Sequence, residues 1–139
     1  MKKLFIMALL AVIYQFSFAT LVYFGLGGAE FFGANATFPE MNNPENNNLA
    51  LNLLSSIITG VAFYYGFQKF SDESHSNISG AKLGFFVSVF AVITTNISKE
   101  SFNNFYISNS IATLETLIWV LHFIVFGVVT AVVFRKIKD

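Results

Sequence analysis

The chain has 139 residues and no net charge, and 55% of its residues are hydrophobic while only 12% are charged. A soluble domain carries about 25% charged residues, so this composition, with 18 phenylalanines and a mean hydropathy of +0.63, argues against a water-soluble fold. The absence of cysteine excludes disulfides and thiolate chemistry, and the scattered basic residues form no stripe that would bind nucleic acid.

Four apolar stretches are long enough to cross a bilayer as helices, because about 20 such residues span its roughly 30 Å hydrocarbon core. The sequence therefore predicts an all-α fold, in which residues 1–139 form a single transmembrane domain built as an antiparallel four-helix bundle. Residues 27–48 and 98–110 are predicted to be outer loops, and residues 68–80 a cytoplasmic loop. The expected spans are residues 4–25, 49–67, 81–97 and 111–134.

The first stretch has features of a secretory signal. Lys2 and Lys3 precede an apolar run, and Ser17-Phe18-Ala19 places small residues where a signal peptidase cleaves. The apolar character continues to Gly25, which exceeds the 7–15 residues of a signal core. An uncleaved span is therefore favoured, and removal of residues 1–19 is the alternative, which would leave three spans.

The next segment, residues 27–48, reads as an aqueous loop because proline and asparagine favour turns, and irregular backbone cannot face lipid. It carries Glu30, Glu40 and Glu45 and no basic residue, which makes the outer side acidic. Phe38 and the two phenylalanines before it are expected to anchor at the headgroup level.

Small residues recur one turn apart on the later spans. Ser56 precedes Gly60 by four residues, as Ala62 precedes Gly66, and the same spacing recurs on the third and fourth spans. Without bulky side chains, two helices approach closely in lipid. The predicted packing residues are Gly60, Gly66, Gly80, Gly84 and Gly127.

Polar residues inside the spans are the candidates for function, because each is costly in lipid unless it is paired, neutral or hydrated. Glu115 and His122 lie seven residues apart, on one face of the last span. Either they are structural, with His122 bonded across the bundle to Asn52, Ser55, Ser88 or Gln15 and Glu115 reaching the headgroups, or they form a proton or cation path. The intramembrane candidates are His122, Glu115, Gln15, Asn52 and Ser88.

The basic residues predict the orientation. Lys99 lies on one side of the spans, opposite the other seven Lys and Arg residues. Because cytoplasmic loops collect basic residues, both termini are expected in the cytoplasm. The low charge and the Asn- and Phe-rich composition favour the inner membrane of a bacterium.

Two functions remain open. The first is a structural or accessory protein that associates with itself or with a larger membrane complex through the small-residue faces. The second is a small ion- or proton-permeation unit using Glu115 and His122. No nucleophile with its base and no H-E-x-x-H metal motif occurs, so no enzymatic activity, metal or cofactor is expected. The expected partners are the lipid bilayer and other membrane helices, and not nucleic acid.

Overall fold

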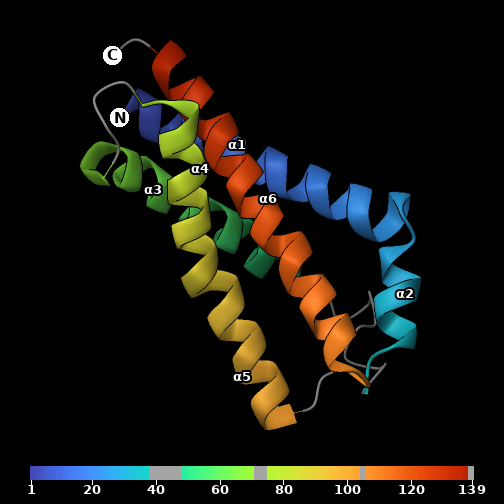
Figure 1. The fold of residues 1–139 in the computed structure, drawn as a ribbon. Helices are drawn as coiled ribbons and strands as arrows, with labels where there is room; N and C mark the ends of the chain where they lie inside the picture. The colour runs from blue at the N-terminus through green and yellow to red at the C-terminus, as the bar shows by residue number, and fades with distance from the viewer. Residues whose placement is uncertain (38–47, 71–74, 104–105, 138–139) are drawn as a thin grey trace.

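The computed structural model describes residues 1–37, 48–70, 75–103 and 106–137, with side chains for all of these except residues 99–103. Within these ranges the chain is all-helical (Figure 1), apart from an isolated antiparallel bridge between Ala36 and Tyr106. Four of the described helices are long and apolar enough to cross a membrane. They are Lys2–Gly25, Leu49–Phe70, Asn77–Ser98 and Asn109–Lys136.

Two of these rods contain a π-helical segment, in which the wider turn carries backbone hydrogen bonds between residues five apart. The segment η1 continues α1, and η4 joins α4 to α5 without a break. The elements in order are α1 (Lys2–Ala19), η1 (Thr20–Gly25), α2 (Gly28–Ala34), α3 (Leu49–Phe70), α4 (Asn77–Ser88), η4 (Val89–Ile93), α5 (Thr94–Asn103) and α6 (Asn109–Lys136).

The predicted loop 27–48 contains a helix that the sequence reading missed. Gly27 adopts a left-handed φ of 73°, which turns the chain directly into α2. The side chain of Phe32 on α2 is 5% exposed, so burial of this ring holds the short helix in place. The expectations for Phe38, Glu40 and Glu45 lie outside the described residues.

The other two predicted loops are shorter than expected. Within 98–110, α5 continues to Asn103, so this helix extends beyond the end of the apolar run. Within 68–80, α3 runs on to Phe70 and α4 begins at Asn77. The length of an apolar stretch therefore underestimates the length of these helices, because polar residues continue them.

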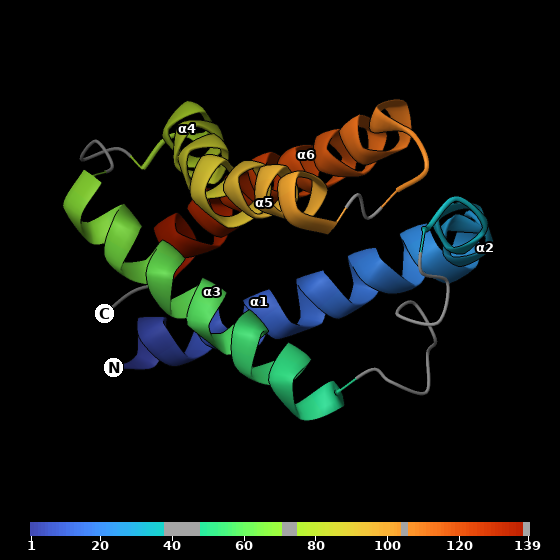
Figure 2. The ribbon, with the colours of Figure 1, turned by 90° about the horizontal axis from the view of Figure 1, so that it is seen from below.

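The rods pack in two pairs that meet through α6. The most extensive contact runs between α4 and α6, followed by the crossing of α1 with α3. Figure 2 shows α4, α5 and α6 side by side, with α1 and α3 crossing below them. α1 also contacts α6, and α3 contacts α4 and α6.

The two termini lie together at one end of the molecule, beside the end of α3 and the start of α4 (Figure 1). The Arg135 guanidinium donates to the His75 carbonyl oxygen and to Asn77 Oδ1, each at 2.7 Å. The Lys3 ammonium lies 5.1 Å from the ring centroid of Phe134, which is cation–π distance. Side chains thus join the first helix, the start of α4 and the last helix at this end.

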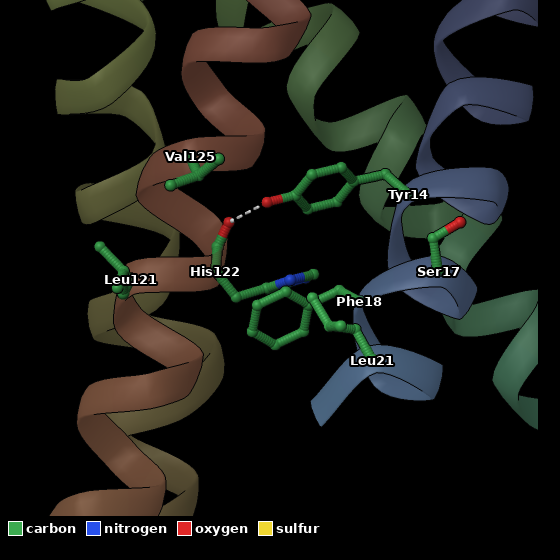
Figure 3. A pocket seen from close by; sticks show the side chains of 7 residues that line it. All are labelled: Tyr14, Ser17, Phe18, Leu21, Leu121, His122 and Val125. Atoms are coloured by element: carbon green, nitrogen blue, oxygen red, sulfur yellow. Dashed lines mark hydrogen bonds between the residues drawn. The ribbon is translucent and has the colours of Figure 1, made fainter. Parts of the chain in front are cut away.

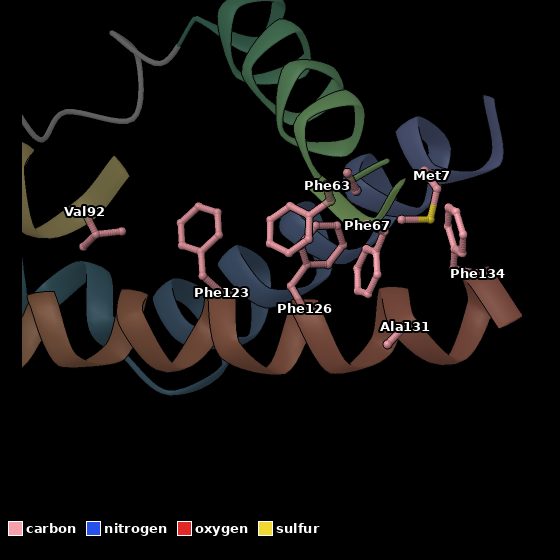
Figure 4. Close-up of a cluster of buried hydrophobic side chains, with 9 residues drawn as sticks. Met7, Phe63, Phe67, Val92, Phe123, Phe126, Ala131 and Phe134 are labelled. Carbon is pink, nitrogen blue, oxygen red and sulfur yellow. The ribbon is translucent and has the colours of Figure 1, made fainter. Parts of the chain in front are cut away.

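Buried aromatic rings fill the centre of the bundle near this end. Figure 4 shows Phe63 and Phe67 of α3 facing Phe126 and Phe134 of α6, with Met7 of α1 beside them. The ring centroids of Phe63 and Phe126 are 4.7 Å apart, and those of Phe67 and Phe134 are 5.6 Å apart. Because lipid removes the hydrophobic drive between helices, close packing of this kind holds them together.

The outer surface is apolar along every rod. Phe5 on α1, Phe90 on η4 and Leu117 on α6 are 71%, 64% and 60% exposed. A soluble protein rarely leaves large apolar patches of this kind in water. A lipid bilayer is the solvent in which this surface is stable.

Candidate functional site

Glu115 and His122, the ionisable pair that the sequence singles out in α6, are both buried. The structure leaves 8% of Glu115 and none of His122 exposed. Both face the first rod, formed by α1 and η1, and Trp119 lies between them on the same face of α6. The sequence therefore placed the two residues correctly on one helix face.

The ring of His122 sits in an aromatic shell. Its centroid is 4.3 Å from that of Phe18, 5.0 Å from that of Tyr14 and 5.2 Å from that of Trp119. Neither ring nitrogen has a hydrogen-bond partner among the described residues. The expected bond to Asn52, Ser55, Ser88 or Gln15 is therefore wrong, because aromatic side chains occupy the space where a polar partner would lie.

The expected polar partners are engaged elsewhere. Gln15 bridges α1 and α3, since its Oε1 accepts from the Ser56 hydroxyl at 2.7 Å. The hydroxyl of Ser88 donates to the carbonyl oxygen of Phe85 on its own helix at 2.6 Å. Asn52 lies on the exposed side of α3, where its backbone carbonyl accepts from Ser56. Gln15 thus joins two helices, while Ser88 bonds within its own helix and Asn52 lies on the exposed side of α3.

Glu115 is buried near the start of α6, where its side chain lies against the first rod. Tyr23 of η1 is a close neighbour of Glu115 and Trp119. The Tyr23 and Trp119 rings are 6.3 Å apart. Glu115 therefore lies at the contact between η1 and α6, one turn from the aromatic shell of His122.

A groove opens beside His122 between the first rod and α6 (Figure 3). Its volume is about 350 Å³, and its walls are almost entirely apolar. Across its upper part the Tyr14 hydroxyl donates to the His122 carbonyl oxygen at 3.3 Å. The lining residues are Tyr14, Ser17, Phe18, Leu21, Leu121, His122 and Val125.

The sequence reading missed Tyr14 and Phe18, which form the wall opposite His122. A usable signal existed, because two aromatic residues four apart share one face of a helix. On a span otherwise rich in aliphatic residues, this pair marks the side of α1 that packs against α6.

The predicted small-residue faces form close helix contacts within this chain. A Cβ added to Gly84 would lie 2.8 Å from the Phe123 carbonyl carbon, and one added to Gly127 would lie 2.9 Å from the Gly80 carbonyl carbon. A Cβ on Gly60 would lie 2.6 Å from the Ala8 Cα of α1. These faces thus bring α4 onto α6 and α1 onto α3.

Gly66 makes a softer contact than the other packing glycines. An added Cβ would lie 2.9 Å from the Cδ1 atom of Leu83, which is the far end of a flexible side chain. α3 and α4 therefore approach each other through a side chain that can move.

No group of three potential metal ligands gathers among the described His, Asp and Glu residues. The second histidine, His75, packs edge to face against Phe134 at the end of the molecule that holds the termini. Within the described part of the chain, His122 therefore belongs to no three-ligand cluster.

Comparisons with protein-family models, with curated proteins and with solved structures give no match for this chain. Its class follows from the fold, which is all-helical with four helices long and apolar enough to span a membrane. It is a small multi-pass membrane protein.

Proposed function

We propose that this chain is a structural or accessory membrane protein that acts by helix–helix contact with another membrane-embedded chain. The observation that supports this most is the exposed first half of α3. Every residue of 49–55 is exposed, and Leu49, Leu51 and Leu54 have exposed fractions of 64%, 61% and 52%. Nothing in the described part of the chain covers these two turns.

The exposed side of α3 also has the composition of a helix contact. Asn52, Ser55 and Ala62 are exposed, and Thr59 between them is half-buried, so small and polar residues follow one face at helical spacing. Polar groups facing lipid are costly, and helix association in membranes uses small and hydroxyl-bearing residues of this kind. A partner helix on this face would remove them from lipid.

The glycine faces of α4 and α6 do not offer a second contact of this kind. Gly80 and Gly84 pack on α6, and Gly127 packs back on α4. Because these surfaces meet within the chain, association through the small-residue face of α4 would require the bundle to open. The proposed contact therefore lies on α3.

We also propose that the chain lies in a bacterial cytoplasmic membrane with both termini inside. The support is the distribution of basic residues, since seven of the eight lie at the termini or beside the connection of α3 and α4. Both termini lie at one end of the bundle (Figure 1), which supports the part of the proposal that puts them on the same side of the membrane. A reporter fused to Ile137 that is active only in the cytoplasm would test it.

An ion or proton route through Glu115 and His122 has less support. The ring of His122 is buried between aromatic rings of the first rod and α6, and Phe126 and Phe63 follow toward the termini. A permeating ion needs polar or hydrated lining along its way. Among the described residues the way past His122 is aromatic.

The test uses the absence of cysteine from the sequence. A single cysteine at Ser55 places a thiol on the proposed contact face, and one at Leu9, which is 49% exposed on α1, is the matched control. Oxidation in native membranes should link Ser55→Cys to a second copy or to a larger chain, and leave Leu9→Cys unlinked. Equal linking of both, or a monomeric particle without any partner in mild detergent, would refute the proposed contact.

A further inference from the structure

The groove between the first rod and α6 is open to the lipid side of the bundle. Leu21, Leu121 and Val125 line it and have exposed fractions of 56%, 60% and 42%. Its volume of about 350 Å³ is at the lower end of the roughly 300–1,000 Å³ that ligand pockets occupy. A molecule dissolved in the bilayer could enter sideways without passing through water.

The inner wall of this groove holds an unsatisfied polar group. His122 is fully buried, and both of its ring nitrogens are without a partner among the described residues. An uncharged imidazole carries one N–H donor and one acceptor nitrogen. Leaving both unpaired in an apolar site costs free energy, and such exceptions in folded proteins call for an explanation.

We propose that the groove binds a neutral quinone of the bilayer, with a ring carbonyl accepting a hydrogen bond from the His122 N–H. The depth of the site supports this class of ligand. His122 lies midway along α6, which at 1.5 Å per residue is about 42 Å long. A charged lipid headgroup is not stable at that depth, whereas a quinone ring is uncharged and apolar except at its carbonyls.

The aromatic shell also suits a flat ring. Phe18 and Tyr14 lie on the α1 side of the imidazole, and Figure 3 shows the ring of Phe18 against that of His122. Aromatic rings pair favourably when stacked with an offset or edge to face. Both nitrogens are covered in the structure, so the side chain of Phe18 turns aside when the quinone binds, and the quinone ring then packs against Tyr14. The tail of the quinone then lies against Leu121 and Val125.

The chain carries its own reporter for this binding. Trp119 is the only tryptophan in the sequence, and its ring is 5.2 Å from that of His122. A quinone in the groove would quench its fluorescence. The experiment titrates the purified full chain in mild detergent with decylubiquinone, a short-tailed benzoquinone, and follows tryptophan emission.

The expected result is saturable quenching whose apparent Kd is about tenfold weaker in His122→Phe, which keeps a ring but removes the hydrogen bond. Val125→Phe, which fills the groove without touching the core, should also weaken binding. Leu9→Phe, on the lipid side of α1 away from the groove, should leave it unchanged. Circular dichroism of each variant confirms that the helices are retained.

Two outcomes would overturn the proposal. Quenching that fails to saturate, or that is the same in the wild type, His122→Phe and Val125→Phe, would mean that the quinone only partitions into the micelle. Decylbenzene has the same tail but no carbonyl. If it bound the groove as tightly as decylubiquinone, the groove would take an apolar tail without recognising a carbonyl. The proposal would be supported if decylbenzene failed to displace decylubiquinone and if His122→Gln, which keeps a hydrogen-bond donor, restored the affinity lost in His122→Phe.

Discussion

The contact between α4 and α6 can be tested by adding one methyl group at Gly84. A Cβ there would lie 2.8 Å from the carbonyl carbon of Phe123 and 2.9 Å from the Cα of Ile124, whereas ordinary contacts begin at 3.4 Å. The carbonyl oxygen of Phe123 lies closer still, so the two backbones must separate by more than about 0.6 Å, the difference between 3.4 and 2.8 Å. All of the atoms that would be struck belong to the backbone of α6, so no side chain can rotate away.

Two opposing effects set the change in the free energy of unfolding of Gly84→Ala. Overpacking of a close contact costs about 1–3 kcal/mol, and alanine gains up to about 1 kcal/mol over glycine in helix propensity. We expect Gly84→Ala to lower the free energy of unfolding by about 1–2 kcal/mol. Gly66→Ala should lose less, because Leu83 can move aside.

The assay is equilibrium unfolding in mixed micelles of mild detergent and dodecyl sulfate, followed by circular dichroism and Trp119 emission. Gly33→Ala is the matched control, because a Cβ on Gly33 in α2 meets nothing within 4 Å. The expected order of stability is Gly33→Ala, then Gly66→Ala, then Gly84→Ala. If Gly84→Ala were as stable as Gly33→Ala, α4 and α6 could not be in the close contact described.

Three further changes test other contacts. Ser56→Ala removes the 2.7 Å bond to Gln15 and should cost about 1 kcal/mol of stability in the same assay. Arg135→Ala removes the 2.7 Å bond to Asn77 and should speed hydrogen exchange at the start of α4 while changing global stability by less than about 1 kcal/mol. His122→Phe should leave stability unchanged or raise it by about 1 kcal/mol, because it removes buried nitrogens without partners.

Each of these three predictions has a result that would contradict it. Full stability in Ser56→Ala would show that α1 and α3 do not depend on that bond. Unchanged exchange at the start of α4 in Arg135→Ala would contradict its tie to α6. A loss of more than about 2 kcal/mol in His122→Phe would mean that the ring nitrogens are hydrogen-bonded after all.

The sequence predicted the four spans because the bilayer sets their length directly, and the structure bears out an all-helical chain with four such helices. It could not predict which helices pair. The spacing of Gly80 and Gly84 indicates a close helix contact, but this spacing is the same whether the partner is α6 or a second chain. The pairing depends on Gly127, whose matching position becomes evident only in three dimensions.

The surroundings of His122 were missed for a related reason. A buried imidazole normally finds a polar partner, so the prediction looked to Asn52, Ser88 and Gln15. The structure places aromatic residues of α1 there, since the crossing of α1 with α3 at Gly60 turns the face carrying Tyr14 toward α6. Such a crossing depends on packing between helices, which one-helix periodicity does not contain.

The position of His122 follows from the two neighbours that α6 must satisfy at once. Gly127 and the backbone of Phe123 meet the glycines of α4, which fixes the rotation of α6 about its axis. That rotation leaves Trp119 and His122 on the adjacent face, toward the first rod. The imidazole is therefore held in place by a contact in which it takes no part, and within the described residues its two nitrogens have no hydrogen-bond partner. A residue retained for packing alone would be better served by phenylalanine at this position, and this is why His122→Phe separates a structural role for the ring from a binding role for its nitrogens.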